Sequence, residues 1–363
     1  MQAKPWAWLL SVYRAQSHAR WADWLLSTFS EFDWQRFELP GRHFSWRIRG
    51  NPLSWLDSLP AQTPDLIIAT SMVDLATLKG LHPRLAGVRT VLYFHENQFA
   101  YPKSAAQTTS LEAQMVQLYS ALAADRVLFN SDYNRRTFIG GIDALLARMP
   151  DHVPEGVSSR IAEKSRTVPV PIDPIRPADV RDRALIAWNH RWEYDKNPDL
   201  FADAMIALGQ RGVEFRLALL GPRHRKTPAA LARLREAMPE RIVADDALPT
   251  SEYRAVLGRA AIAVSTATHE FQGLGMLEAA SAGCLPLVPD ALCYPEIYPA
   301  EYRYPPDDRG ALVNRLADWL SGNAPDPVNV ERWTALQLEP DWGRALVDED
   351  TRFHEAMGQS RDA

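Results

Sequence analysis

The sequence predicts an α/β protein of two doubly wound domains, each a parallel sheet with helices on both faces. Short, wholly apolar segments alternate with longer amphipathic ones, and this alternation occurs twice along the chain. Between the two occurrences, residues 167–183 hold four prolines. Proline at that density prevents a helix and stiffens an extended segment, as suits a linker. A chain of 363 residues is also comfortable for two cores of similar size.

The first domain is expected to span residues 1–178. Its predicted strands are 7–12, 66–70, 90–94 and 126–130, and its predicted helices are 19–29 and 111–123. Because these strands are apolar throughout, we expect a parallel sheet that is buried on both faces.

The second domain is expected to span residues 179–340. Its predicted strands are 185–189, 216–220, 242–244, 262–265 and 285–288, and its predicted helices are 198–210, 228–238, 251–259 and 274–282. Residues 341–363 are expected to form a C-terminal helix, 342–357, and a tail that pack on the first domain. Two such domains joined by a linker are expected to face each other across a cleft.

Composition narrows the possible classes of protein. The content of hydrophobic residues, 46%, and of charged residues, 23%, is typical of a folded globular chain. A net charge of −5 argues against nucleic-acid binding by the whole surface but permits a local basic patch. No apolar run has the length of a membrane span and the N-terminus lacks a signal peptide, so a cytoplasmic protein with no membrane partner is expected. Cys284 and Cys293 are expected to be core residues.

The strongest motif lies at 265–286, STATHEFQGLGMLEAASAGCLP. A buried strand is expected to end in a polar turn, and a helix to open near Gly273. The backbone N–H groups of Gly273, Leu274 and Gly275 would then form an anion site. Glu270 precedes the helix and would face the group beyond a diphosphate, whereas Glu278 could bind a pair of ribose hydroxyls. The alternative is an unrelated strand–loop–helix whose two glutamates face solvent.

The second motif, 185–198, is LIAWNHRWEYDKNP. A strand leads into a loop that carries Arg191 and Lys196, just before a helix that Pro198 opens. Two cations at the end of a strand can bind a diphosphate and stabilise it as a leaving group. The alternative is a surface ion pair with Glu193 or Asp195.

The third motif, 91–102, places polar side chains where a first-domain strand ends. Ligands of parallel sheets bind at the carboxyl ends of strands, so these side chains are expected to hold a sugar or its acceptor. The expected residues are His95, Glu96, Asn97, Gln98, Asn130 and Ser131.

Residues 34–50 interleave cations with aromatic residues, a pattern that suits RNA phosphates and unpaired bases. The candidate RNA-binding residues are Arg36, Arg42, His43, Trp46, Arg47 and Arg49. The alternative is that Phe37, Phe44 and Trp46 pack into the core with the arginines solvated. Residues 223–226 form a second basic patch. This patch could also bind RNA, or it could instead lie near a bound nucleotide. Asp125, Asp245 and Asp246 make no Asp-x-Asp motif, and no metal is expected.

These motifs resemble those of known enzymes. Glu270 and Glu278 match the Glu-x7-Glu signature of retaining GT-B glycosyltransferases, which have two Rossmann-like domains. Over nearly the whole chain, the strings 92–98, 123–131, 188–198 and 294–296 resemble the tRNA-queuosine mannosyltransferases. That family implies GDP-mannose as donor and the cyclopentenediol of queuosine, in the anticodon of tRNA-Asp, as acceptor.

The resemblance also implies roles for residues of this chain. Lys196 and Arg191 would stabilise the departing phosphate, Glu270 would hold sugar hydroxyls, and His95 would hold the sugar on the acceptor side. The implied donor-binding set is His190, Arg191, Lys196, His269, Glu270, Gly273, Leu274, Gly275 and Glu278. No cofactor is expected beyond GDP-mannose as co-substrate. The loop 13–18 retains Ser17 and His18 of the family pattern on the acceptor side, but it lacks the family's glycines.

Two other functions fit the same motifs. One is a GT-B enzyme that uses another nucleotide sugar on a glycan or a small metabolite. The other is a non-catalytic binding protein on the same fold. A dehydrogenase is disfavoured because no Gly-x-Gly-x-x-Gly follows an early strand.

Overall fold

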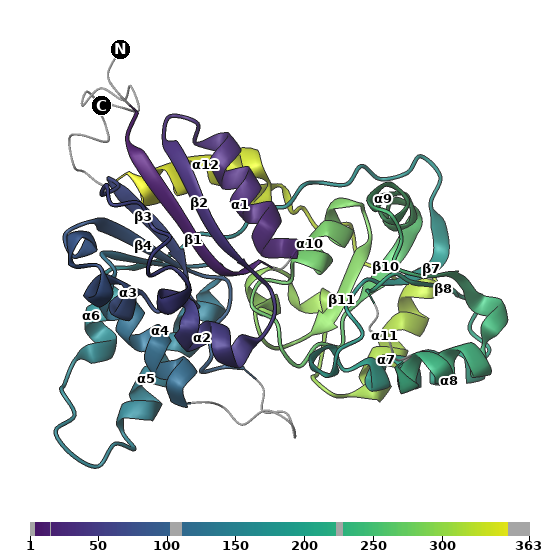
Figure 1. The fold of residues 1–363 in the computed structure, drawn as a ribbon. Helices are drawn as coiled ribbons and strands as arrows, with labels where there is room; N and C mark the ends of the chain where they lie inside the picture. The colour runs from purple at the N-terminus through teal and green to yellow at the C-terminus, as the bar shows by residue number, and fades with distance from the viewer. Residues whose placement is uncertain (1–3, 15, 102–110, 223–227, 348–363) are drawn as a thin grey trace. The chain divides into compact units, whose positions relative to one another are not determined.

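The computed structural model describes residues 4–14, 16–101, 111–222 and 228–347. The chain divides into two compact units (Figure 1). The first unit comprises Met1–Val170 and Leu338–Ala363, and the second comprises Pro171–Gln337. The division therefore falls within the proline-rich segment 167–183.

The first unit is built on a six-stranded sheet in the order β2-β1-β3-β4-β5-β6, in which every pair of neighbours is parallel. The central strand β3 is buried at every position, as its unbroken apolar sequence predicts. The strands are β1 (Trp6–Arg14), β2 (Asp33–Pro40), β3 (Leu66–Thr70), β4 (Arg89–Phe94), β5 (Arg126–Phe129) and β6 (Ser165–Thr167).

Two aromatic helices pack together in this unit (Figure 1). Trp342 of α12 (Ala335–Leu346) contacts Trp21 and Trp24 of α1 (Gln16–Thr28), with ring centroids 5.7 and 5.9 Å apart. The indole of Trp342 also donates a hydrogen bond to the carbonyl of Pro169, 2.9 Å away. The C-terminal helix was expected at 342–357, so it begins earlier than predicted, and its expected end lies outside the described residues.

The remaining helices of the first unit pack among themselves and on the sheet. Trp8, Ile48 and Leu75 belong to one buried cluster that joins β1 to α2 and α3. These helices are α2 (Phe44–Ser54), α3 (Leu75–Leu81), α4 (Leu111–Ala123), α5 (Asp132–Leu146) and α6 (Val157–Glu163).

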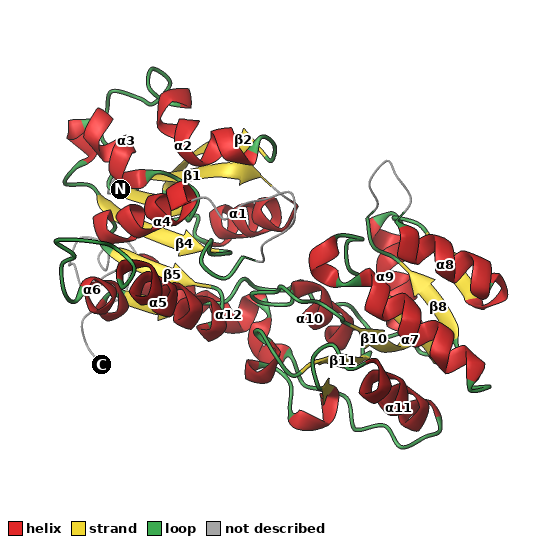
Figure 2. Ribbon diagram, turned by 90° about the horizontal axis from the view of Figure 1, so that it is seen from below, coloured by secondary structure: helices red, strands yellow, loops and turns green. Residues whose placement is uncertain are grey.

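The second unit has a six-stranded parallel sheet in the order β12-β11-β10-β7-β8-β9. Figures 1 and 2 show α7, α8 and α11 on one face of it and α9 and α10 on the other. The strands are β7 (Asp182–Trp188), β8 (Arg216–Leu219), β9 (Ile242–Asp245), β10 (Ala260–Val264), β11 (Leu285–Pro289) and β12 (Arg303–Tyr304). The helices are α7 (Pro198–Gln210), α8 (Ala229–Ala237), α9 (Thr250–Arg259), α10 (Leu274–Ser281) and α11 (Arg309–Leu320).

In this second sheet the strand order reverses between β7 and β10, which lie side by side. Such a switch point leaves room for a ligand between the loops that follow the two strands. The two strongest sequence motifs follow β7 and β10, so the fold brings them to the same edge of the sheet.

Helix α2 was not expected from the sequence. It contains Gly50 and Pro52, both of which disfavour a helix interior. Tertiary contacts offset this poor propensity, since the side chain of Asn51 is fully buried and hydrogen-bonds to the carbonyl of Met72 at 3.2 Å.

Candidate active site

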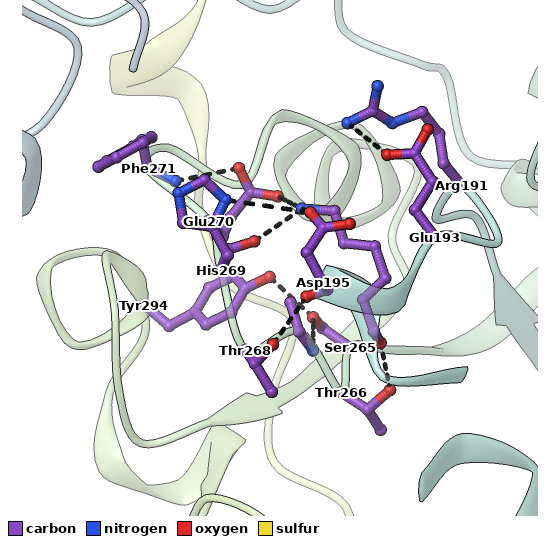
Figure 3. A network of polar contacts seen from close by, with 12 residues as sticks. Arg191, Glu193, Asp195, Ser265, Thr266, Thr268, His269, Glu270, Phe271 and Tyr294 are labelled. Atoms are coloured by element: carbon purple, nitrogen blue, oxygen red, sulfur yellow. Dashed lines mark hydrogen bonds and ion pairs between the residues drawn. The ribbon is translucent and has the colours of Figure 1, made fainter. Parts of the chain in front are cut away.

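The loops after β7 and β10 are hydrogen-bonded to each other (Figure 3). Thr266 donates its hydroxyl to the carbonyls of Lys196 and Asn197, at 2.8 and 2.9 Å. The backbone N–H of Thr268 donates to the carbonyl of Asp195 at 2.9 Å. These contacts fix the position of Lys196 against the second loop.

Lys196 is buried among acceptors, with only 7% of the residue exposed. Its Nζ lies 2.7 Å from the carbonyl oxygen of His269, 3.1 Å from Asp195 Oδ2 and 3.3 Å from Glu270 Oε2. Burial alone would lower the pKa of Lys196, but the charges of Glu270 and Asp195 outweigh it and the pKa is raised. The ammonium group is therefore charged at neutral pH.

Glu270 lies at the N-terminus of α10, and its Oε1 accepts a hydrogen bond from the backbone N–H of Phe271 at 3.1 Å. Burial opposes its ionisation, but Lys196, the nearby imidazoles and the backbone amide of Gly273 lower the pKa of Glu270 to about 2. The carboxylate thus occupies part of the amide site that the sequence assigned to a ligand anion.

Two imidazoles flank this cluster, on His190 and His269, which are 5% and 6% exposed. Burial, and next the charge of Lys196, lower the pKa of each to about 4, so both rings are neutral at neutral pH. His190 Nε2 is buried without a hydrogen-bond partner among the described residues. A buried polar atom in that state indicates a place that a ligand or water satisfies.

Arg191 follows His190, but its guanidinium is turned to Glu193, with Nη2 and Oε2 3.3 Å apart (Figure 3). Just over half of its side chain, 55%, is exposed. The surface ion pair of the alternative interpretation is present for Arg191 with Glu193, whereas the ion pair of Lys196 with Asp195 is buried. The fold brings Lys196 to Glu270, whereas the ion pair of Arg191 is with Glu193, outside that cluster.

Glu278 lies on α10 in a second hydrogen-bond network. Its Oε2 accepts from the hydroxyl of Tyr253, on α9, at 3.1 Å. Asn189 Nδ2 donates to that hydroxyl at 3.2 Å and to the carbonyl of Gly275 at 2.7 Å. The sequence analysis did not assign Asn189 or Tyr253 to the site. Asn189 is the last residue of the predicted strand 185–189 and follows the observed strand β7, which was a usable signal, but Tyr253 belongs to no motif.

The glycines of the motif are required by close contacts. Gly273 has a φ of 71°, and a Cβ there would lie 2.9 Å from Tyr294 Cε1. A Cβ at Gly275 would lie 3.3 Å from Asn189 Nδ2. The two glycines therefore let the side chains of Tyr294 and Asn189 pack directly against the backbone of this segment.

In the first unit, His95 ends β4 and stacks on His18 of α1, with centroids 4.0 Å apart and 20° between the rings. His18 Nδ1 is 2.9 Å from the carbonyl of Tyr13. The ring of His95 also meets Trp21 and Tyr93 edge-on. Burial, and then His18, lower the pKa of His95 well below its usual value, so the imidazole is neutral. The structure thus brings together two of the predicted acceptor-side residues. Ser17, which precedes His18 in α1, is half-buried.

Several other predicted acceptor-side residues make hydrogen bonds within the first unit. Asn97 is fully buried, donates to Asn134 Oδ1 at 2.9 Å, and accepts from the N–H of Phe99 at 3.0 Å. Ser131 caps α5. Asn130 donates to the carbonyl of His95 at 2.8 Å. Since Asn97 exposes no surface, in this structure it shapes the loop and does not line a ligand site. Gln98 is also buried, and Glu96 is half-buried.

The candidate RNA-binding segment forms β2, a turn and the first turns of α2. Trp46 is 54% exposed, so it does not pack into the core as the alternative interpretation required. Phe37 and Phe44 are partly buried against the core. The remaining candidates differ in their contacts. Arg36 pairs with Asp23 at 2.7 Å, Arg49 pairs with Asp74 at 2.7 Å, Arg42 and His43 are exposed, and Arg47 is half-buried.

Three structural observations bear on the remaining predictions. The proposed second basic patch, 223–226, falls outside the described residues. Among the residues that are described, no helix is long and apolar enough to cross a membrane. Within the same residues, no group of three or more histidine, cysteine, aspartate or glutamate side chains could hold a metal.

The fold and the site define a class of protein. Similar solved structures include the galactosyltransferase WaaB of the lipopolysaccharide outer core, with a TM-score of 0.64, 14% identity, and coverage of 94% of this chain and 98% of that one. Anabaena HepE with UDP and glucose has a TM-score of 0.64, 12% identity and coverage of 93% and 99%. Sucrose-phosphate synthase from Thermosynechococcus elongatus has a TM-score of 0.63, 15% identity and coverage of 98% and 98%. The chain has the GT-B fold of such glycosyltransferases.

Sequence comparison identifies the family within that class. Residues 7–172 match the family described as tRNA-queuosine alpha-mannosyltransferase N-terminal. The tRNA-queuosine alpha-mannosyltransferase of Drosophila melanogaster is 33% identical over 328 residues, which cover 86% of each chain. The chain belongs to the tRNA-queuosine alpha-mannosyltransferase family.

Proposed function

We propose that this protein transfers mannose from GDP-mannose to the cyclopentenediol of queuosine in the anticodon of tRNA-Asp, with retention and without a metal. Family membership supports the substrates. The observation that carries the chemistry is Lys196, a buried ammonium held between Asp195 and Glu270 at the N-terminus of α10. This is a fixed positive charge where negative charge would develop on a departing phosphate.

The charges of the ligand-free site suggest how a donor is bound. Lys196 faces two carboxylates, Asp195 and Glu270, and both neighbouring imidazoles are neutral, so the local charge is −1, from one positive and two negative groups. A diphosphate therefore needs further positive charge. Arg191 can supply it by exchanging Glu193 for a phosphate, because its side chain is exposed.

Glu270 would exchange partners as well. When sugar hydroxyls donate to its carboxylate, the amide of Gly273 becomes available to a phosphate oxygen. Glu278, with Tyr253 holding one oxygen, would accept hydrogen bonds from the ribose hydroxyls.

In the transfer step, the bond between the anomeric carbon and the phosphate oxygen breaks, and the acceptor oxygen bonds to that carbon from the same face. The acceptor proton passes to the departing phosphate. Lys196 and Arg191 stabilise the charge on that phosphate. His95, a neutral imidazole stacked on His18, would hold the sugar on its acceptor-facing side.

A matched transfer assay tests this proposal. Labelled GDP-mannose, GDP-glucose, UDP-glucose and UDP-galactose would each be incubated with queuosine-containing and queuosine-free tRNA-Asp. We expect label only with GDP-mannose and queuosine-containing tRNA, and no label with the Lys196→Ala variant. Transfer from a UDP-sugar, or to a glycan in place of tRNA, would establish the rival acceptor or donor, and binding without transfer would establish the non-catalytic rival.

Treatment with EDTA tests the metal-free part of the proposal separately. Because side chains and helix amides are expected to stabilise the leaving group, turnover should survive exhaustive chelation. Loss of turnover that magnesium or manganese restores would show that a metal takes part.

A further inference from the structure

Trp46 has an unusual position on α2. It is 54% exposed, and it lies one helical turn before Gly50. A Cβ built on Gly50 would lie 2.5 to 2.6 Å from the indole atoms Cε2, Cδ2 and Cζ2. Three ring atoms at nearly equal distance mean that the indole lies flat over the glycine. One face of the ring is thus covered by the helix, and the other face is left to solvent.

Glycine is among the poorest helix formers, so its place in the interior of α2 needs a reason. The nearest atoms around a Cβ at Gly50 all belong to Trp46. A side chain at position 50 would therefore collide with the indole where it now lies. A tryptophan buried in the core would not need a glycine one turn later on the same helix. A tryptophan whose ring lies flat on the helix surface does need one.

Helix α2 is itself held in place. The buried Asn51 donates to the carbonyls of Arg47 and Met72, at 2.8 and 3.2 Å, and accepts from the N–H of Asp74 at 3.1 Å. The helix begins directly after His43, which has a left-handed φ of 56°. These contacts fix the helix against the unit, so Trp46 is presented on a rigid support.

The surroundings of Trp46 are basic. Residues 39–56 contain Arg42, Arg47 and Arg49 and no aspartate or glutamate. Arg49 pairs with Asp74, but half of its side chain is exposed and the aspartate is almost fully buried, so the arginine presents the charge at the surface. This combination of one free aromatic face and several cations suits an unpaired base with its flanking phosphates.

The segment also lies at the ligand-binding edge of the sheet. The turn before α2 follows the carboxyl end of β2, and a Cβ at Gly41 would lie 3.2 Å from the carbonyl oxygen of Arg14, at the carboxyl end of β1. His18 and His95 follow the carboxyl ends of β1 and β4 in the same parallel sheet.

We propose that Trp46, held flat by Gly50, is a preformed platform on which one unpaired base of the RNA substrate stacks, while Arg42 and Arg47 contact the neighbouring phosphates. This proposal rests on the proposed RNA substrate, and it adds the part of the surface that binds the RNA and the residue that forms it.

Gly50→Ala is the sharpest test, because it keeps the Trp46 side chain and only displaces its indole ring from the helix. Alanine is the better helix former, so the melting temperature should hold or rise. Affinity for a synthetic, unmodified anticodon stem–loop RNA should fall, as it should in Trp46→Ala. A lost stack on one base corresponds to about 5- to 150-fold weaker binding.

Two controls separate stacking from other effects. Tyr119→Ala removes another exposed aromatic of the same unit and should leave RNA affinity unchanged. A fully paired RNA duplex offers no unpaired base, so the Trp46→Ala variant and the wild type should bind it with the same affinity.

The possible failures are distinguishable. If wild type binds the stem–loop and both Gly50→Ala and Trp46→Ala retain that affinity, the platform proposal is wrong and the proposed function stands. If either variant instead loses self-association in sedimentation while RNA binding is unchanged, the face contacts a second copy and the proposal is likewise overturned. If wild type binds neither this stem–loop nor queuosine-containing tRNA-Asp, the proposed function itself fails.

Discussion

At the scale of single residues, Lys196 has a structural role beside the catalytic role proposed for it. Its ammonium group satisfies two buried or half-buried carboxylates, Asp195 and Glu270. We expect Lys196→Ala to lower turnover on the order of 10²–10³-fold, as loss of a preorganised charge does. It should also lower the free energy of unfolding by about 3–5 kcal/mol, because the carboxylates lose their partner. Urea unfolding and single-turnover transfer measure the two effects.

Arg191→Ala is the matched variant on the same loop. Its guanidinium is exposed and pairs with Glu193 at 3.3 Å, so its removal should change stability by less than about 0.5 kcal/mol. Turnover should nevertheless fall, if the arginine turns to the donor phosphate. Normal turnover in Arg191→Ala would remove it from the site and leave Lys196 as the phosphate ligand.

Tyr253 is expected to act through Glu278. Its hydroxyl donates to Glu278 Oε2 and accepts from Asn189 Nδ2, so it fixes the position of the carboxylate that is proposed to bind the ribose. Tyr253→Phe should weaken donor binding by about 1.5–3 kcal/mol, the range for a hydrogen bond to a charged group. Calorimetric titration with GDP, and with ribose-free pyrophosphate as the control ligand, separates this role from a general loss of structure. Equal weakening for both ligands would contradict it.

The sequence could assign Lys196 and Glu270 to one donor site from their motifs, but it did not predict that β7 and β10, the strands before them, adjoin. It could not predict the contact of Tyr253 with Glu278. That contact depends on how α9 packs beside α10, which is set by side-chain packing and not by a motif. It also could not show that Asn97 turns inward, since a polar residue after a strand can hydrogen-bond either to a ligand or to its own loop.

At the scale of elements, the N-terminus of α7 positions the catalytic loop. Asn197 has a left-handed φ of 47°, and its side chain accepts a hydrogen bond from the N–H of Leu200 at 3.3 Å. Asn197→Ala should destabilise the protein by about 0.5–2 kcal/mol through the lost cap, and further through the left-handed backbone. It should also lower turnover, since Lys196 precedes this residue.

Asn197→Gly is the control for the backbone part of that effect. Glycine adopts the left-handed conformation without strain and costs only a few tenths of a kcal/mol at an N-cap. Thermal unfolding should therefore rank wild type above the glycine variant and both above the alanine variant. Equal melting temperatures for the two variants would show that the backbone conformation carries no strain.

Elements with a strong pattern were predictable, and elements held by tertiary contacts were not. The predicted ranges 66–70, 111–123 and 198–210 agree with β3, α4 and α7, because an unbroken apolar run or a clear helical face leaves little choice. Helix α2 escaped prediction because Gly50 and Pro52 oppose a helix, and its stability comes from the buried Asn51.

At the scale of the whole molecule, buried histidines in both units make the stability of the protein depend on pH. The pKa of His190 and of His269 is lowered from 6.5 to about 4, chiefly by burial, and burial lowers that of His95 well below its usual value. As pH falls below 6.5, the unfolded chain takes up protons that the folded chain refuses, so stability falls until the folded histidines titrate near 4. Glu270 adds a loss at lower pH, because its folded pKa is about 2 and its ordinary value is 4.5.

We therefore expect the urea midpoint of unfolding to fall steadily between pH 6.5 and 4.5. Each histidine that the fold keeps neutral contributes up to about 1.4 kcal/mol per pH unit in this range. His269→Asn removes one such group, so its stability should depend less steeply on pH than that of wild type, whatever its absolute stability. His43→Asn, at an exposed position where asparagine tolerates the left-handed backbone, should keep the wild-type slope. If His269→Asn and wild type show the same slope, the imidazole of His269 is protonated in the folded protein, and the site then carries an additional positive charge for the phosphates.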